Sequence, residues 1–119
     1  MPQWLENDFI NESFSDNEKS IIVDKQAFSL SIEDANTYFS SDIERQCKPT
    51  NYAIANGAHV NSSNGNCWWW LSTRWYNQNY NSLVKSGGDI SVNGDNVNYL
   101  GNAVRPALWI NLKSIDKLN

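Results

Sequence analysis

The longest unbroken apolar run of the chain is Cys67-Trp68-Trp69-Trp70-Leu71. A segment this short, apolar and aromatic is typical of a buried β-strand. Because side chains alternate along a strand, Trp69 is expected to face one side of a sheet, with Trp68 and Trp70 on the other. We expect at least two of the three rings to be mostly buried. Trp69 and Trp70 are therefore predicted to be structural residues of the core.

The sequence that follows this run predicts short strands joined by polar turns. Residues 83–92 are typical of a hairpin around Ser86-Gly87-Gly88. The Asn93-Gly94 step predicts a type I′ turn, which needs positive φ at both central positions. Residues 104–112 are expected to end the chain as a strand, with Pro106 at an edge or a bulge because it cannot donate to a ladder.

The sequence that precedes the run predicts short helices instead. Helices are expected over residues 3–12, 16–21, 32–39 and 50–57. Ser15 with Glu18, and Ser31 with Asp34, have the spacing of capping boxes, in which each side chain satisfies the other residue's backbone N–H. Gly57 is the expected residue just after the last of these helices, where a positive φ is common.

Length and composition predict one α+β domain spanning residues 1–119. The chain has 119 residues, which is room for a single core, and 40% of them are hydrophobic. Its eighteen Asn and fourteen Ser residues favour turns and loops, and Asn becomes frequent after Asn51. A helical half, residues 1–57, is thus expected to pack on a strand-and-loop half, residues 58–119.

Charge and hydropathy argue against two classes of partner. The formal net charge is −4 with scattered lysines, so a nucleic-acid surface is not expected. No apolar run approaches the ~20 residues that cross a bilayer, and no charged-then-apolar leader opens the chain. We therefore expect neither a membrane span nor a signal peptide, and the sequence leaves the cellular location unknown.

The best candidate for a ligand surface is the aromatic and amide-rich segment over residues 75–81. Its predicted binding residues are Trp75, Tyr76, Asn79 and Tyr80. Flat rings give contact area at little entropic cost, and amides both donate and accept hydrogen bonds, which suits sugars or peptide backbone. The alternative is that these rings cover the core beside the tryptophan strand.

Three other residues have chemistry that the sequence leaves open. Cys47 and Cys67 are predicted to lie close together, either as adjacent thiols or as a disulfide. A catalytic thiol with His59 as its base is the weakest alternative, because neither residue is in a recognisable nucleophile turn. Arg105 is expected to be structural, donating to a carboxylate or to loop carbonyls, although it could also recognise an anion.

A metal or cofactor site is not expected. Residues 89–95 imitate the start of an EF-hand loop, with oxygen ligands at alternate positions and a glycine at the sixth. The twelfth position, which needs a bidentate Glu, is Leu100. The two cysteines and one histidine are also one ligand short of a structural zinc site.

Four segments together resemble a bacterial family catalogued as domain of unknown function 6273. They are Trp-Leu-Glu-Asn-Asp-Phe at 4–9, Lys-Pro-Thr-Asn-Tyr-Ala at 48–53, the tryptophan run at 67–71, and Val-Arg-Pro-Ala-Leu-Trp-Ile-Asn-Leu at 104–112. The resemblance implies a C-type-lectin-like fold, in which helices flank a small twisted antiparallel sheet with long polar loops. Ser72 stands where family members usually have an arginine.

The resemblance supplies a fold and little chemistry, because no activity is established for the family. We expect the chain to be a non-catalytic binding or display module of a bacterial or phage protein, with a glycan or a protein as ligand. The alternatives are a purely structural module of a larger surface protein and, less favoured, an enzyme of the formylglycine-generating fold. Family domains begin with strands that this chain lacks, so we expect an N-terminal truncation. Self-association is then expected through the open edge of residues 104–112.

Overall fold

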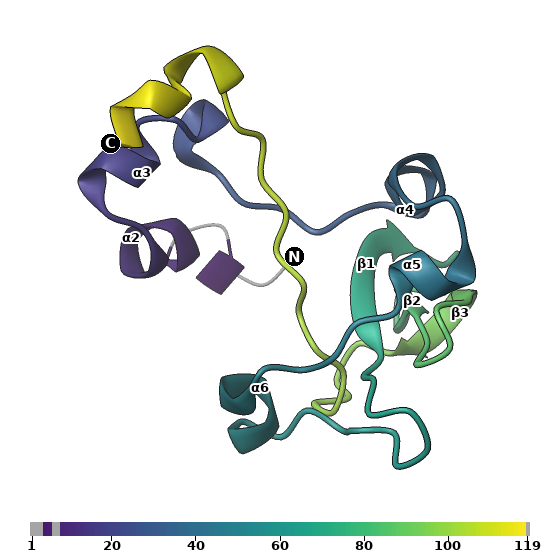
Figure 1. Ribbon diagram of the computed structural model, residues 1–119. Helices are drawn as coiled ribbons and strands as arrows, with labels where there is room; N and C mark the ends of the chain where they lie inside the picture. Colours follow the sequence, from purple (N-terminus) through teal and green to yellow (C-terminus); the bar gives the residue numbers. More distant parts are fainter. Residues whose placement is uncertain (1–3, 6–7, 119) are drawn as a thin grey trace. The chain divides into compact units, whose positions relative to one another are not determined.

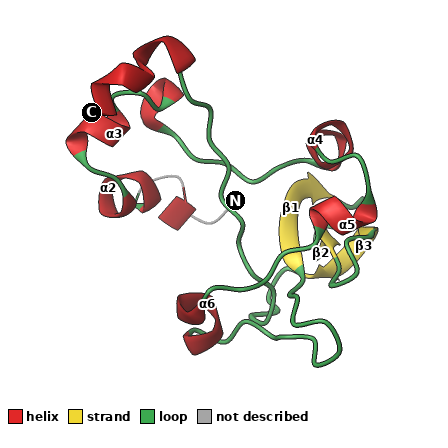
Figure 2. Ribbon diagram, in the orientation of Figure 1, coloured by secondary structure: helices red, strands yellow, loops and turns green. Residues whose placement is uncertain are grey.

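The computed structural model describes residues 4–5 and 8–118, and its fold class is α+β (Figures 1 and 2). The chain divides into two compact units. One is formed by Met1–Ser29 with Pro106–Asn119, and the other by Leu30–Arg105. This division does not follow the helical and strand halves expected from the sequence, because two of the four predicted helices, over 32–39 and 50–57, belong with the sheet. That residues 1–119 form one domain stays a prediction.

The unit Leu30–Arg105 contains a three-stranded antiparallel sheet in the order β1-β2-β3. Its strands are β1 (Trp69–Arg74), β2 (Tyr80–Val84) and β3 (Ile90–Asn96). In the first pair of strands, Trp69 lies opposite Val84. In the second pair, Val84 lies opposite Ile90. The structure therefore confirms both the tryptophan strand and the hairpin around Ser86-Gly87-Gly88.

The type I′ turn predicted at Asn93-Gly94 is wrong, because both residues lie inside β3. Ser82 alone separates Asn81 from Leu83, whereas residues 92–94 separate their partners on β3, so β3 has a bulge here. Gly94 adopts a φ of +54°, and a Cβ at this position would lie 1.7 Å from the carbonyl oxygen of Asn81. The glycine thus allows the two strands to approach closely, which is a common role of glycine within a strand.

The core of this unit forms around Trp69, which has no exposed surface. Its buried neighbours are Ala35, Leu71 and Val84, and several half-buried side chains pack on this cluster: Leu30, Ile32, Phe39, Cys47, Ile90 and Ala103. Trp68 and Trp70 are half-buried. Full burial at 69 and 71 with partial burial at 68 and 70 is the alternation expected of a strand with one face on the core.

Three short helices belong to the same unit. They are α4 (Ile32–Tyr38), α5 (Asp42–Arg45) and α6 (Asn51–Ala55). The Ser31–Asp34 capping box at the start of α4 is present in both directions. After α6, Gly57 has a φ of +101° and its N–H donates to Ile54, while Ala58 donates to Ala53. This pair of bonds is a Schellman motif, as the position of Gly57 predicts.

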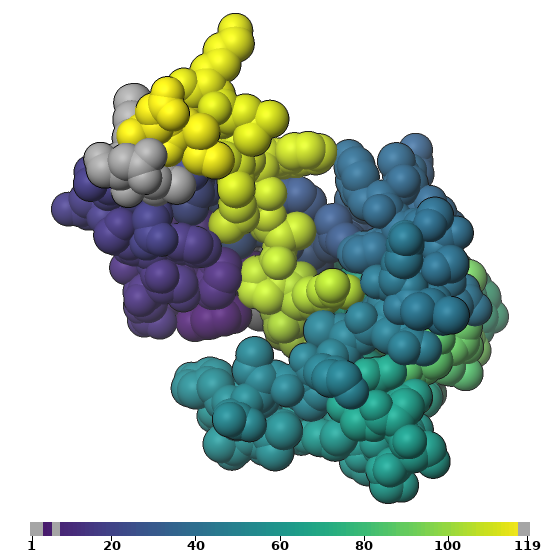
Figure 3. Space-filling model, in the orientation of Figure 1, coloured from purple at the N-terminus to yellow at the C-terminus, as the bar shows by residue number. Residues whose placement is uncertain are grey.

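The segment containing α4 and α5 lies against the sheet (Figure 1). The space-filling view shows side chains of this segment, in blue, covering much of the sheet in that orientation (Figure 3). The Nε1–H of Trp69 donates to the carbonyl oxygen of Arg45 at 3.0 Å, which ties α5 to the core tryptophan. Helix α5 has only four residues, and the sequence did not predict it.

The other unit contains short helical elements from both ends of the chain. They are α2 (Phe9–Ser13), α3 (Asp16–Lys19), η1 (Val23–Lys25) and η2 (Leu112–Leu118). The Ser15–Glu18 capping box is present, as predicted. Residue 3 and residues 6–7 of the helix expected over 3–12 lie outside the described residues. Its later part corresponds to α2.

The continuous strand predicted over residues 104–112 is wrong. Within this unit, the segment forms only isolated bridges, between Phe28 and Ala107 and between Ile22 and Ile110. Two residues separate Ala107 from Ile110, whereas five separate their bridge partners, Phe28 and Ile22. The extra residues include η1, in which Asp24 has a positive φ. The segment therefore has backbone partners earlier in the chain, whereas the truncation argument expected an open edge. Self-association through it stays a prediction.

None of the helices among the described residues is long and apolar enough to cross a membrane. The longest α-helix in this part of the chain, α4, has seven residues.

Candidate functional site

The predicted binding residues gather at the turn between β1 and β2. We call Trp75, Tyr76, Asn79 and Tyr80 the aromatic tip. The Trp75 N–H donates to the Tyr80 carbonyl at 3.3 Å, which closes the turn, and the Tyr80 N–H donates to Asn77 at 3.0 Å. The N–H of Val97, just after β3, donates to Asn79 at 2.9 Å. These backbone bonds hold the tip on the sheet.

Trp75 contacts both of the other rings of the aromatic tip. The ring centroids of Trp75 and Tyr76 are 4.0 Å apart, with their planes tilted by 51°. Tyr80 approaches Trp75 edge-on, with centroids 6.2 Å apart. Trp75 is half-buried and Tyr80 is exposed, while Tyr76 is 84% exposed. Trp75 thus supports an aromatic surface that faces solvent.

Asn79 contributes polar groups beside these rings. Its backbone N–H donates to the side-chain oxygen of Asn77 at 3.0 Å, and its carbonyl accepts from Val97. The Asn79 side chain is exposed. The tip therefore presents an exposed amide next to two exposed tyrosine rings.

The structural residues expected from the sequence lie around the core. Arg105 is half-buried, and its guanidinium lies over the rings of Phe39, at 5.2 Å, and Trp69, at 4.9 Å. It also donates to the carbonyl oxygen of Arg45 at 3.5 Å. Cation–π contacts of this kind stabilise a partly desolvated arginine. The partners of Arg105 are thus two rings and a carbonyl at the end of α5, and not the carboxylate or loop carbonyls that were expected.

Cys47 and Cys67 lie together as free thiols. The backbone N–H of Cys67 donates to the Cys47 carbonyl at 2.9 Å, and the Cys67 thiol donates to the same oxygen at 3.3 Å. A hydrogen bond from the Cys67 thiol lowers the pKa of Cys47 to about 6, with help from the charge of Arg105 and against the effect of burial. The same hydrogen bond, followed by burial, raises the pKa of Cys67.

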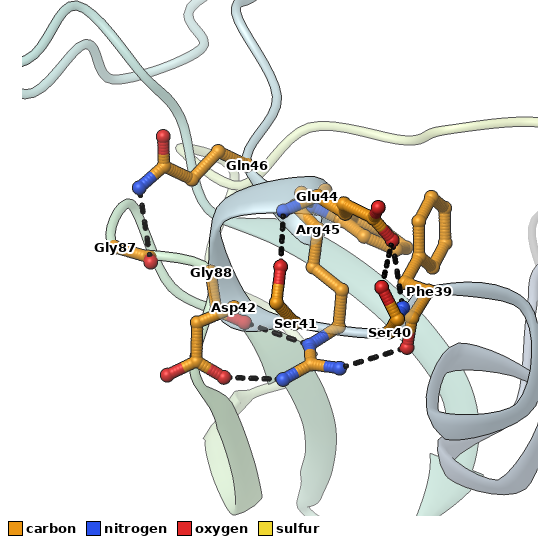
Figure 4. A network of polar contacts seen from close by, with 10 residues as sticks. Phe39, Ser40, Ser41, Asp42, Glu44, Arg45, Gln46, Gly87 and Gly88 are labelled. Carbon is orange, nitrogen blue, oxygen red and sulfur yellow. Dashed lines mark hydrogen bonds and ion pairs between the residues drawn. The ribbon is translucent and has the colours of Figure 1, made fainter.

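A buried arginine, Arg45, organises a polar network that the sequence did not reveal (Figure 4). Its side chain pairs with Asp42 one turn earlier on α5. Its Nε–H donates to the Gly88 carbonyl at 2.9 Å, and a terminal nitrogen donates to Phe39 at 3.5 Å. Arg45 is only 8% exposed. The Asp42-to-Arg45 spacing, typical of a surface helical pair, was the only signal in the sequence.

The turn between β2 and β3, which contains Gly88, also accepts hydrogen bonds from side chains of two other segments. Gln46 donates to the Gly87 carbonyl at 3.1 Å (Figure 4). Two asparagines, Asn64 at 3.2 Å and Asn66 at 3.0 Å, donate to the Ser86 carbonyl. Many of the asparagines after Asn51 are thus used to hold loops, which agrees with the tendency of Asn to bond to backbone groups.

A separate feature of this unit is a pocket beside Trp68. It has a volume of about 200 Å³ and is lined by His59, Trp68, Asp95, Tyr99, Gly101 and Asn102. No pattern in the sequence predicts this pocket, because its lining residues come from four separate segments.

The residues that imitate an EF-hand loop belong mainly to β3, and their side chains bond to one another. The Ser91 hydroxyl donates to Asn93 at 3.1 Å and accepts from the Gly94 N–H at 3.1 Å. Within residues 4–5 and 8–118, no three His, Cys, Asp or Glu side chains are grouped so that they could hold a metal ion.

Comparisons of the chain with family models, with curated proteins and with solved structures find no match.

Proposed function

We propose that this chain is a non-catalytic glycan-binding module with a C-type-lectin-like fold, related to the bacterial family 6273, and that the aromatic tip is its ligand surface. The observation that supports the proposal is the Trp75–Tyr76 pair. Its centroids are 4.0 Å apart, yet Tyr76 is 84% exposed. A ring that served only the core would be buried.

The chemistry of the tip favours a sugar over other ligands. Sugar rings present apolar C–H faces that pack on aromatic rings, and hydroxyl edges that exchange hydrogen bonds with groups that both donate and accept. Tyr76 and Tyr80 supply rings and hydroxyls, and Asn79 supplies an exposed amide. The tip carries no charged side chain of its own, which suits an uncharged polar ligand.

An array of immobilised glycans tests this proposal. The wild-type chain is expected to bind at least one glycan class, and Tyr76→Ala is expected to weaken that binding at least about tenfold, or ~1.4 kcal/mol. The matched control is Tyr52→Ala, which removes a tyrosine that is 77% exposed on α6. It should bind like the wild type. Because Tyr76 lies outside the core, the melting temperature of Tyr76→Ala should be nearly unchanged.

Two outcomes would contradict the proposal. One is that the chain binds no glycan on the array but does bind a protein partner. The other is glycan binding that Tyr76→Ala leaves intact while Tyr52→Ala removes it.

A further inference from the structure

We infer that the pocket beside Trp68 is a separate binding site for one sugar-sized, hydroxyl-rich molecule. Pockets for drug-sized ligands enclose about 300–1,000 Å³. A volume of about 200 Å³ is below that range and fits a single small ring. The aromatic tip contributes no residue to its lining, so this site stands or fails independently of the proposed function.

The walls of the pocket are fixed by backbone hydrogen bonds. The Ala103 N–H donates to Trp68 at 2.8 Å, and the Trp70 N–H donates back to Ala103 at 3.0 Å, so the segment after Tyr99 runs beside the start of β1. The His59 N–H donates to the Gly101 carbonyl at 2.9 Å. The lining segments are therefore joined to one another and to the sheet, which gives a preformed site.

Two rings and three polar side chains line this cavity. Trp68 is half-buried, and the Lys85 ammonium lies 5.5 Å from its ring centroid. Tyr99 folds back so closely over Gly101 that a Cβ on that glycine would lie 2.4 Å from the tyrosine hydroxyl oxygen. A side chain at position 101 would therefore displace the Tyr99 ring from its place at the pocket.

The polar groups suit hydroxyls in particular. Asp95 accepts from the Asn102 amide at 3.3 Å and from the Asn96 N–H at 2.8 Å, which orients the carboxylate. A carboxylate oxygen has more than one lone pair, so Asp95 can also accept from a ligand. Asn102 and His59 add groups that can donate or accept. Rings beside a fixed carboxylate and amide are a combination that binds a sugar face and its hydroxyl edge together.

The test is a titration with four probes, the methyl glycosides of glucose, galactose, mannose and N-acetylglucosamine, followed by ¹⁵N-detected NMR. At least one probe is expected to shift the Trp68 indole N–H and the Asn102 side-chain amide in a saturable way. Trp109, which stacks on Phe28 in the other unit, supplies an indole signal that should not move.

The variants separate this site from the aromatic tip. Asp95→Asn should weaken probe binding at least tenfold, because it removes the carboxylate and keeps the size of the side chain. Asp89→Asn is the matched control, since it makes the same change at an exposed aspartate outside the pocket, and should change affinity less than twofold. Tyr99→Leu is a second variant at the pocket and should also lose binding. The NMR spectrum reports whether each variant is folded.

Tyr76→Ala should leave the shifts at Trp68 unchanged, even if it abolishes binding on the glycan array. The inference is overturned if no probe shifts the Trp68 indole, or if folded Asp95→Asn and Tyr99→Leu bind as well as the wild type. It is also overturned if Tyr76→Ala abolishes the Trp68 shifts, because the shifts would then arise at the tip.

Discussion

The two turns at the ends of β2 differ in how deeply their residues are buried. In the β2–β3 turn (residues 85–89), Ser86 and Gly88 are buried, and three successive carbonyls at 86–88 accept side-chain hydrogen bonds from α5 and from other loops. In the β1–β2 turn, local bonds and the bond from the Val97 N–H to Asn79 hold the backbone, and Tyr76 is 84% exposed.

The difference separates the turn that stabilises the sheet from the turn that carries the proposed ligand surface. Buried polar groups need partners, so the β2–β3 turn is fixed by the arginine and amides that reach it. The aromatic tip is free of that requirement, and its rings remain available to a ligand. We therefore expect substitutions at the two ends of β2 to have contrasting effects.

The largest effect is expected at the core tryptophan. Trp69→Ala should lower the free energy of unfolding by about 3–5 kcal/mol, because it leaves a cavity under the sheet. It also removes the bond from the indole to the Arg45 carbonyl. Trp75→Ala at the tip, where the ring is half-buried, should cost under about 1 kcal/mol. Urea unfolding of both variants measures this, and equal losses would place the tip in the core.

The next effect separates steric contact from backbone conformation. A Cβ at Gly88 would lie 1.7 Å from the carbonyl oxygen of Asp42, while a Cβ at Gly57 meets nothing within 4 Å. Both glycines have positive φ, so Gly57→Ala should cost about 1 kcal/mol from φ alone. Gly88→Ala should cost at least about 2 kcal/mol, because α5 must move away. Similar urea midpoints for the two variants would mean that α5 does not pack on this turn.

A somewhat smaller effect is expected from the buried arginine. Arg45→Met keeps much of the apolar volume but leaves the carbonyls of Gly88 and Phe39 without this donor, which should cost about 2 kcal/mol. The Asp42 pair adds little, since that carboxylate is largely exposed. Arg74→Met, at the exposed end of β1, is the control and should change stability by less than about 0.5 kcal/mol. A loss confined to Arg74→Met would contradict the role of the network.

The parts of the fold that the sequence predicted correctly depend on neighbours in the chain. Both capping boxes join residues three apart, and the Schellman motif at Gly57 is equally local. The tryptophan strand was also predictable, because a short apolar run is typical of a buried β-strand, along which the side chains alternate between two faces.

The parts that could not be predicted depend on partners far along the chain. Arg45 is buried because it meets Gly88, 43 residues away, and the residues between them do not encode that contact. Asn93-Gly94 has the composition of a hairpin turn, but the close approach of Asn81 makes it a bulge. For the candidate site, composition located the aromatic tip. The pocket beside Trp68 required the structure, since four segments form it.

The smallest expected effect is a change in cysteine reactivity. It concerns Cys47, which directly follows Gln46 of the network, and its neighbour Cys67. With its pKa lowered to about 6, Cys47 is mostly thiolate at neutral pH, and its alkylation by iodoacetamide should be half-maximal near that pH. Cys67 has a raised pKa and should react slowly throughout. Cys67→Ala removes the donor that stabilises the thiolate, so the midpoint for Cys47 should move upward toward the ordinary value of about 8.5. Mass spectrometry of the alkylated peptides assigns the site, and an unchanged midpoint in Cys67→Ala would show that the two thiols do not interact.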